Sequence, residues 1–411
     1  MWKVNDQLEK KILNLYQSDF KSILYRIEKN KSLFSYNLLK FIWNYSYAIY
    51  SLNTKSIWSE VLEKVDDLLN DHQDMNTFTD EIENDANPTW NHCYDLLVSK
   101  KFKNQTLFNA MNSKSLKLKK LVINEAKKVF RYDKKIIFNE LKDNIIFKDI
   151  EIDFIYNNLN KIIPKKLLKN PPNINKNIYI YINIYENILK KMYEEWHLIY
   201  LQLKEKNFMD INTDSSEFRL QAAYAIPMGK NHTPLCFIHS VKNFNSLRGC
   251  IHEISHCIHF YSYKDKNNAI EIPNYTSVEV FPMFMELVFI FHLDKEYFFT
   301  FIHKQLKVYL KFFLFKNKVK KCNSLKQANK LWRKLNNKKS FWYLEKTIFL
   351  EDNLFNSYLI GAFWSSICAI EYLINGNKDI IIKINSILKE DPREQKNLWF
   401  KNFKNLVEKN E

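Results

Sequence analysis

Glycine and proline are scarce in this chain, and their scarcity limits the folds open to it. The 411 residues contain 4 Gly and 9 Pro. A sandwich or barrel of many strands needs a turn about every ten residues, and such turns depend on Gly and Pro. Hydrophobic residues make up 46% of the chain, which is enough to build a large core. The sequence therefore predicts a mainly α fold with a small β-sheet.

The spacing of apolar residues indicates where the helices and strands lie. Helical spacing runs from about residue 6 to residue 203 and predicts a set of packed helices. Residues 179–185 alternate at strand period but continue into a helical pattern, so we interpret them as the start of a helix. The expected strands are two short apolar runs bounded by Gly, Asn and Pro, at residues 220–226 and 235–239.

The formal charge of +16 raises the question of an anionic partner. The lysines are spread along the chain among Asn, Ile and Tyr, and no nucleic-acid-binding motif accompanies them, so we expect no nucleic-acid partner. Charged residues run through the N-terminal segment, and no apolar run reaches 18 residues, so we expect neither a signal peptide nor a membrane partner. Six cysteines without a C-x-x-C pair predict free thiols and a cytoplasmic protein.

One short motif carries metal chemistry. His252, Glu253 and His256 form H-E-x-x-H, and on a helix both histidines fall on one face, where they reach a single ion. A catalytic zinc needs three protein ligands and an open position that holds water. Glu253 lies beside the metal rather than facing it, which suits a general base. The alternative is two histidines that cap or pack on an ordinary helix.

Three residues are candidates for the third ligand: His259, Glu271 and Glu279. His259 lies about 10 Å along the helix axis from His252, which disfavours it as a ligand. We expect it to support the ligands, to face substrate, or simply to pack in the core. Glu279 begins an apolar helix that Thr276 or Ser277 can cap. A carboxylate from this second helix, packed across the first, completes the site without strain.

Glu286 lies seven residues after Glu279 and therefore on the same helix face. It is placed to accept the ring N–H of His252 or His256 and so fix the tautomer of that ligand. The alternative is a carboxylate that pairs with a lysine at the edge of the core. Pro282, in the same helix, predicts a kink close to the metal.

The stretch 208–286, with HEISHCIH followed by SVEVFPMFME, resembles the M3 family of zinc metallopeptidases, the thimet oligopeptidase and oligoendopeptidase F group. The family pattern is H-E-x-G-H-x-x-H, then a glutamate ligand about two dozen residues later and a further glutamate seven positions beyond. The residues that fall on it are His252, Glu253, His256, His259, Glu279 and Glu286. The resemblance implies one zinc ion and a helical ellipsoid with a deep channel. It also implies cleavage of internal bonds in short peptides, with Glu253 as the base.

The resemblance also implies a division into an N-terminal helical region at 1–205, forming a lid or channel wall, and a catalytic domain at 206–411.

The chain departs from the family pattern in three respects. Ser255 and Ala222 occupy glycine positions of the family. The segment after Phe349 lacks the family's His and several of its Tyr, which leaves Tyr358 as the candidate to hold the carbonyl oxygen in the transition state. The part of the chain before the H-E-x-x-H motif is shorter than in typical members of the family, which leaves open how long a peptide substrate can be.

Two rival functions share these residues. A metallocarboxypeptidase can be built on the same H-E-x-x-H plus Glu site, and it would release single C-terminal residues rather than make internal cuts. A decayed peptidase retained as a binding protein is the second rival, suggested by the altered segment before Tyr358. The full ligand set together with Glu253 favours an active enzyme, because a binding protein has no need of the base.

Overall fold

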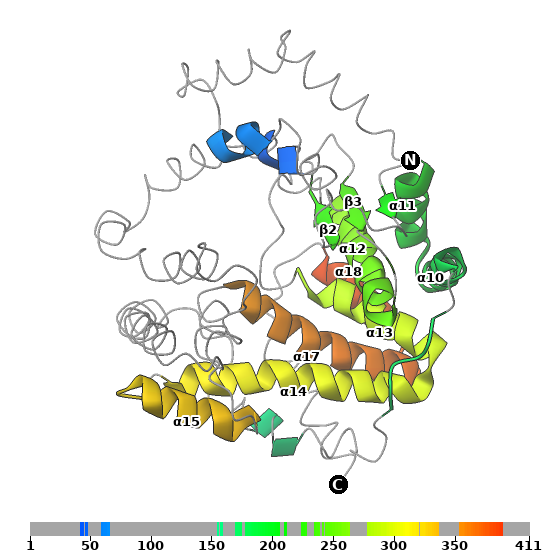
Figure 1. The fold of residues 1–411 in the computed structure, drawn as a ribbon. Coiled ribbons are helices and arrows are strands. Elements are labelled where there is room, and N and C mark those ends of the chain that lie inside the picture. Colours follow the sequence, from blue (N-terminus) through cyan, green and yellow to red (C-terminus); the bar gives the residue numbers. More distant parts are fainter. Residues whose placement is uncertain are drawn as a thin grey trace. The chain divides into compact units, whose positions relative to one another are not determined.

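The fold of the described residues is mainly helical, with one three-stranded sheet (Figure 1). The computed structural model describes residues 42–44, 46–47, 59–65, 154–155, 157–158, 169–174, 177–205, 209–211, 223–227, 234–238, 241, 243–263, 278–319, 321–336 and 353–388. The prediction of a mainly α fold with a small sheet is confirmed for these residues. Most of the helices predicted before residue 169 lie outside them, as do Ala222, Glu271, Thr276 and Ser277.

The chain divides into two compact units. The first combines Met1–Met75, Lys165–Ile302 and Ile360–Leu406, and the second combines Asn76–Pro164, His303–Leu359 and Val407–Glu411. The H-E-x-x-H motif and both glutamates of the expected site belong to the first unit. The division into 1–205 and 206–411 stays a prediction.

Two helices open the continuous part of the first unit, α10 (Ile178–Met192) and α11 (Glu194–Glu205). Asn177 caps α10, since its Oδ1 accepts a hydrogen bond from the Tyr179 amide at 3.0 Å. The buried positions of α10 recur at helical spacing. Residues 179–185, which alternate at strand period, are therefore helical, as the sequence predicted. The helix has an N-cap, and its buried side chains recur at the helical period.

The sheet has the strand order β1–β3–β2. β1 (Met209–Ile211) pairs parallel with β3 (Leu235–Ile238), and β2 (Ala223–Ile226) pairs antiparallel with β3. The two predicted strands are present as β2 and β3. β1 was not predicted, because three residues are too few to show a period.

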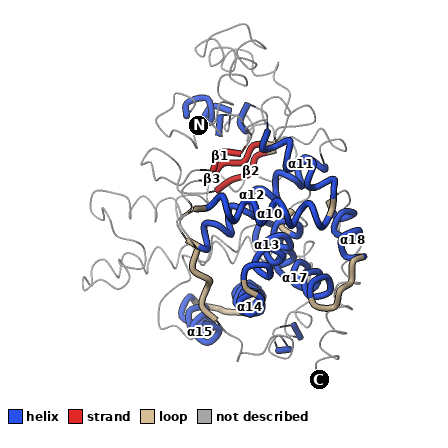
Figure 2. The backbone as a smooth tube through the Cα atoms, turned by 90° about the vertical axis from the view of Figure 1, so that its right-hand side faces the viewer, coloured by secondary structure: helices blue, strands red, loops and turns tan. Residues whose placement is uncertain are grey.

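The helix α12 (Phe244–Tyr263) carries the H-E-x-x-H motif. Asn243 and Ser246 cap its start reciprocally, each side-chain oxygen accepting from the other residue's amide at 3.0 Å. The helix packs against β2 and β3 and also against the helix α13 (Val280–Leu293), as Figure 2 shows. The motif therefore lies on a helix held between the sheet and a second helix.

The helix α13 is buried along almost its whole length. Every side chain from Val280 to Ile290 is buried, as expected for a helix that is apolar on all sides. Pro282 is its third residue, and the first N–H groups of a helix have no intrahelical partner. The predicted kink at Pro282 is therefore not required, because the ring replaces an N–H that the helix does not use.

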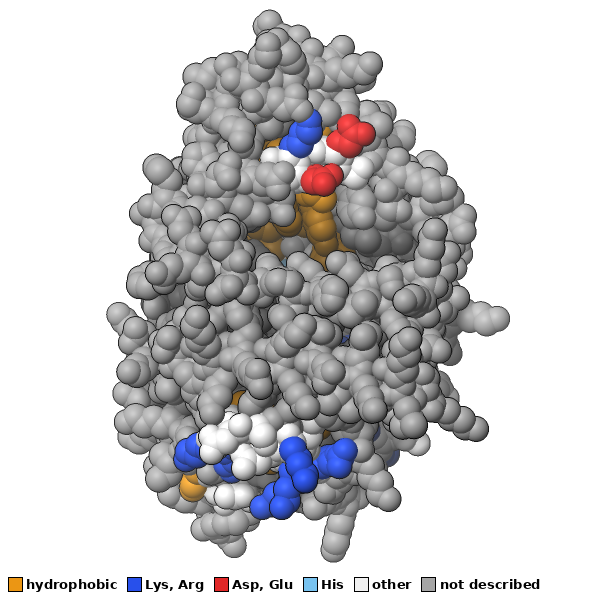
Figure 3. All heavy atoms as spheres, turned by 60° about the vertical axis from the view of Figure 1, so that its left-hand side comes forward, with side chains coloured by type: hydrophobic (Ala, Val, Ile, Leu, Met, Phe, Trp, Pro, Cys, Tyr) orange, Lys and Arg blue, Asp and Glu red, His pale blue; other side chains and the backbone are white. Residues whose placement is uncertain are grey.

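The remaining helices are α14 (Lys295–Val319), α15 (Leu325–Asn336), α17 (Asn353–Leu373) and α18 (Asp379–Ile387). Among the helices that the structure describes, none is both long and apolar enough to cross a membrane. Figure 3 shows a face on which described Lys and Arg side chains gather at the lower edge of the view. α15 exposes Lys326, Lys330, Arg333 and Lys334 opposite a buried Trp332, the pattern of a solvated amphipathic helix.

A pair of buried hydroxyl groups links α10 to α12, the helix that carries the H-E-x-x-H motif. Ser255, which stands at a family glycine position, donates from Oγ to the Ile251 carbonyl at 2.6 Å. Its hydroxyl has one proton, so the 2.7 Å contact with the Tyr185 hydroxyl has Tyr185 as the donor. Ser255 thus replaces the glycine with a side chain that is small enough to be buried and that accepts a bond from the neighbouring helix.

We predict that Ser255→Ala lowers the free energy of unfolding by about 1–3 kcal/mol, because it leaves the buried Tyr185 hydroxyl without its acceptor. Tyr185→Phe should cost about 1 kcal/mol, and the double variant should lose less than the sum of the two single losses. Urea unfolding of the four proteins measures this coupling. Tyr179→Phe is the control, since Tyr179 lies on the same helix and is 61% exposed. Additive losses would contradict the assignment.

Candidate metal centre

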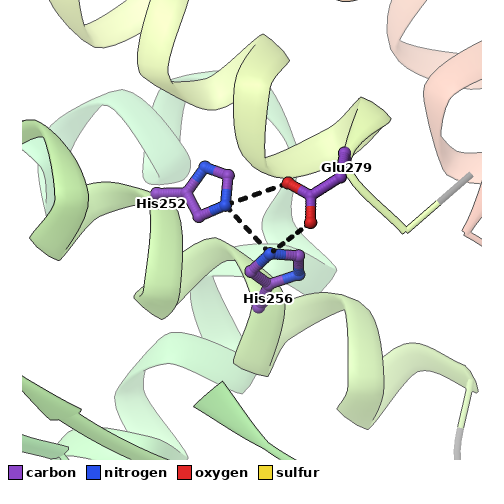
Figure 4. A group of neighbouring side chains, drawn as sticks. All are labelled: His252, His256 and Glu279. Carbon is purple, nitrogen blue, oxygen red and sulfur yellow. Dashed lines mark hydrogen bonds and ion pairs between the residues drawn. The ribbon is translucent and has the colours of Figure 1, made fainter. Parts of the chain in front are cut away.

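Three buried side chains direct their donor atoms at one point (Figure 4). His252 and His256 come from successive turns of α12, and their Nε2 atoms lie 3.0 Å apart. Glu279 reaches them from the start of α13, with Oε2 at 3.1 Å from His252 Nε2 and Oε1 at 3.6 Å from His256 Nε2. The structure thus brings together the three residues that the sequence proposed as metal ligands.

The spacing of these donors fits zinc. Nitrogen and oxygen ligands about 2.0–2.1 Å from a tetrahedral zinc lie about 3.3 Å from one another. The two ring nitrogens lie 3.0 Å apart, each has one oxygen of Glu279 at 3.1 or 3.6 Å, and one donor atom from each residue can be chosen so that all lie within 4.8 Å of one another. Glu279 Oε2 is buried and lies 3.1 Å from His252 Nε2, so a cation between the two atoms would satisfy both as a ligand pair. The group can therefore hold a metal ion.

The backbone at Glu279 leaves its carboxylate free for this task. Glu279 is the N-cap of α13, and its carbonyl accepts from the Met283 amide at 3.1 Å. Its side chain makes no capping hydrogen bond. The sequence predicted that Glu279 lies in the first turn, and the structure places it at the residue before the first turn. A side chain at this position projects from the helix end toward α12 instead of lying along the helix.

Glu286 holds the other side of one ligand. Its Oε1 lies 2.6 Å from His252 Nδ1, and its Oε2 accepts from Arg248 Nη1 at 2.7 Å. Of the two histidines that the sequence offered as partners, the structure selects His252. The expected alternative, a lysine partner, is replaced by an arginine. His252 therefore contacts one carboxylate through each ring nitrogen.

The buried carboxylates of the site favour the binding of a cation. Burial lowers the pKa of His252, but the carboxylates of Glu286 and Glu279 outweigh it and hold that pKa well above its usual value. Burial raises the pKa of Glu279, and the positive charges of His256 and His252 more than offset it, so the carboxyl is ionised. Arg248 supplies positive charge to Glu286, and the buried carboxylate of Glu279 needs positive charge from either protons on the histidines or a divalent metal.

Glu253 and His259 flank the ligands on α12. Burial raises the pKa of Glu253, although the positive charges of His252 and His256 act against it. His259 is 1% exposed, and burial together with the charge of His256 lowers its pKa to about 3. Of the roles left open for His259, the structure favours a neutral side chain packed in the core. The role of Glu253 as general base stays a prediction.

A glycine of α17 allows that helix to approach the third ligand closely. A Cβ atom built at Gly361 would lie 2.6 Å from Glu279 Cβ and 3.0 Å from the Glu279 carbonyl carbon. Such distances are too short for two carbon atoms, so only glycine fits here while Glu279 keeps its place. Gly361 therefore contributes to the position of the third ligand without contacting the metal donors.

Tyr358 lies on α17, as Gly361 does, but it belongs to the second compact unit. Its ring stacks on Tyr309 of α14, with centroids 6.0 Å apart and planes at 7°. The part of Tyr358 in stabilising the transition state stays a prediction.

Sequence reasoning missed two residues that support the site, Arg248 and Gly361. Arg248 carried a signal, because it lies one helical turn before His252 and so shares its face. Gly361 carried a weaker signal, as one of 4 glycines in the chain. Its role depends on which residue of another helix lies opposite, and the local sequence does not contain that information.

Comparisons with known proteins give matches in structure. No protein-family model and no curated protein matches the chain in sequence. A protein from Chlamydophila abortus, provisionally assigned as a peptidase, aligns with a TM-score of 0.53 and 11% identity over 95% of this chain and 91% of its own. A provisionally assigned oligoendopeptidase F from Bacillus anthracis str. Ames aligns with a TM-score of 0.49 and 13% identity, over 94% and 85% of the two chains.

The Chlamydophila abortus match shows a shared fold over nearly the whole chain. PZ peptidase A with an inhibitor also aligns, at a TM-score of 0.42 and 13% identity, over 86% of this chain and 68% of that protein. The structure brings together the three donors that the M3 pattern of the sequence predicted. These three residues could therefore bind a metal ion.

We predict that Gly361→Ala weakens zinc binding about tenfold or more, because the added Cβ displaces Glu279 from the two histidines. It should also lower Tm, since forcing an extra methyl group into a packed core costs about 1–3 kcal/mol. Zinc affinity measured by competition with a chelating dye tests the first effect, and thermal unfolding tests the second.

Gly249→Ala is the matched control. Gly249 lies inside α12, and nothing lies within 4 Å of a Cβ built there. Alanine stabilises a helix interior by about 1 kcal/mol relative to glycine, so this variant should keep its zinc affinity and its Tm or gain stability. Equal zinc affinities for the two alanine variants would show that the close approach at Gly361 does not position the ligand.

Proposed function

We propose that this chain is a zinc-dependent endopeptidase that hydrolyses internal bonds of short peptides. The observation that carries the proposal is the convergence of His252, His256 and Glu279 from two helices, with Glu253 adjacent to the first ligand. An ordinary core would not bury two histidines and a glutamate around one point, with a second buried glutamate behind one of the histidines, without a use for them. The fold shared with the Chlamydophila abortus protein, which is provisionally assigned as a peptidase, supports the same interpretation.

The residues of the site would have different roles in hydrolysis. His252, His256 and Glu279 would hold the zinc, and three protein ligands leave a coordination position open. Zinc bound there supplies a Lewis acid that polarises a peptide carbonyl and lowers the pKa of a water to about 7. Glu286 holds Nδ1 of His252 and so directs Nε2 toward the metal position.

Glu253 would move the proton. A carboxylate beside the ligands accepts a proton from the attacking water and then donates it to the leaving amine. Burial raises the pKa of Glu253, which brings its basicity closer to that task. Tyr358 is the proposed donor to the oxygen of the tetrahedral transition state.

The proposal extends to the setting of the enzyme. Short peptides are the proposed substrates, reaching the site through a channel of the kind that the M3 resemblance implies, with residues 1–205 as the lid or wall. We also propose a cytoplasmic location, which rests on the thiol content of the sequence: the cysteines within the described residues are free.

We predict that Glu253→Gln lowers kcat by about 10²–10⁴-fold, because the amide cannot accept the proton of the attacking water. The variant should still bind one zinc, since Glu253 is not among the three converging donors. Cleavage of an internally quenched peptide, measured beside the zinc content of the same preparation, tests both expectations.

Glu279→Gln is the matched control, because it makes the same chemical change at a proposed ligand. It should lose zinc as well as turnover, whereas Glu253→Gln should lose turnover alone. Turnover retained in Glu253→Gln would refute its role as the base. A wild-type protein that binds zinc but cleaves no peptide would favour the decayed peptidase retained as a binding protein.

Product analysis separates the two kinds of peptidase that this donor set supports. We predict that a peptide of about ten residues is cut at internal bonds, and that amidation of its C-terminus leaves the rate unchanged. Mass spectrometry of early time points measures the products. Release of single C-terminal residues, blocked by amidation, would identify a metallocarboxypeptidase instead.

A further inference from the structure

Arg248 forms the outer end of a chain of contacts that ends at a metal donor. It lies on α12 one helical turn before His252, so both side chains project from the same face. Both reach Glu286 of α13, and each takes a different oxygen, Arg248 at 2.7 Å from Oε2 and His252 Nδ1 at 2.6 Å from Oε1. One carboxylate is therefore held at both oxygens by two residues of one helix.

Glu286 is buried, so its negative charge needs a partner of opposite charge. Its side chain is 1% exposed, so its charge has lost the solvation that water would give. When His252 serves as a metal ligand it is neutral, and it then offers Glu286 a hydrogen bond but no charge. Arg248 is permanently charged, and its side chain is 29% exposed, so it keeps part of its own solvation. It therefore supplies the opposite charge that the buried carboxylate requires.

Arg248 is itself held in place from a third helix. Its guanidinium carbon lies 5.2 Å from the centroid of the Phe301 ring of α14, within the range of a cation–π contact. A planar guanidinium stacks on a ring and donates along its own plane at the same time, and a lysine ammonium has no such plane. The contact fixes the direction from which Arg248 meets Glu286.

We propose that Arg248 is a positioning residue of the metal centre. By occupying Oε2 of Glu286 it leaves Oε1 for the Nδ1–H of His252, and this contact keeps the Nε2 lone pair of His252 directed at Glu279 and His256. Arg248 is not one of the three converging donors, and it acts on the metal position through Glu286. The inference rests on the metal centre of the proposed function and adds a residue that acts from outside the ligand set.

The test is a comparison of zinc affinities, measured by chelator competition on the full-length protein. Arg248→Met keeps a side chain of similar length and removes the charge and the N–H donors, and it should weaken zinc binding about 10–100-fold. Arg248→Lys keeps the charge and N–H donors but loses the planar guanidinium, so it should recover part of that loss. Arg333→Met is the matched control, since Arg333 is exposed on α15, and it should bind zinc as the wild type does.

A double-variant cycle separates positioning from general stability. If Arg248 acts through Glu286, then Arg248→Met should change zinc affinity by no more than about twofold in a Glu286→Gln background. Thermal unfolding of the zinc-free proteins reports any structural loss by itself. Zinc affinity of Arg248→Met equal to that of the wild type would overturn the inference, as would equal losses in both backgrounds.

The readout also distinguishes this inference from the proposed function. A wild-type protein that binds zinc without cleaving peptides would refute the peptidase and still test Arg248 through its affinities. A wild-type protein without zinc affinity would overturn both. Normal cleavage with unchanged zinc affinity in Arg248→Met would overturn the inference alone.

Discussion

The contact between α12 and α13 through His252 is the interaction on which the rest of the site depends. One imidazole meets Glu279 through Nε2 and Glu286 through Nδ1, and these two carboxylates come from the N-cap and the interior of α13. Burying two carboxylates is costly unless each finds a charge or a donor. The packing of the two helices is therefore also a condition for placing the metal ligands.

Other parts of the first unit maintain this contact from outside. Tyr185 of α10 binds Ser255 on the metal helix, and Gly361 allows α17 to approach Glu279. The sheet packs on α12 through β2 and β3. Each of these contacts restricts the movement of one helix against another, which matters because metal donors tolerate displacements of only a few tenths of an ångström.

The departures from the M3 pattern have different consequences for the site. Serine at position 255 is accommodated by a bond that a glycine could not make, so this departure strengthens the link between two helices. The altered segment around Tyr358 bears on the proposed contact with the oxygen of the transition state and not on the three metal donors. The proposed zinc binding and the proposed catalysis thus depend on different residues, and the proposed experiments measure them separately.

The sequence by itself determined the elements and the donors. Helical periodicity, the scarcity of glycine and the spacing of H-E-x-x-H depend on residues close together in the chain, so they predicted α10, the metal helix and the pair of histidines. The spacing of Glu279 and Glu286 likewise showed that they share a helix face.

Only the tertiary structure decided how these elements meet. It selected His252 rather than His256 as the partner of Glu286, and it placed Arg248 at the second oxygen of that carboxylate. It also gave Gly361 and Pro282 roles that depend on which atoms lie beside them. The physical reason is that a local pattern fixes which residues share a face, whereas the register of one helix against another is set by burial between segments distant in the chain.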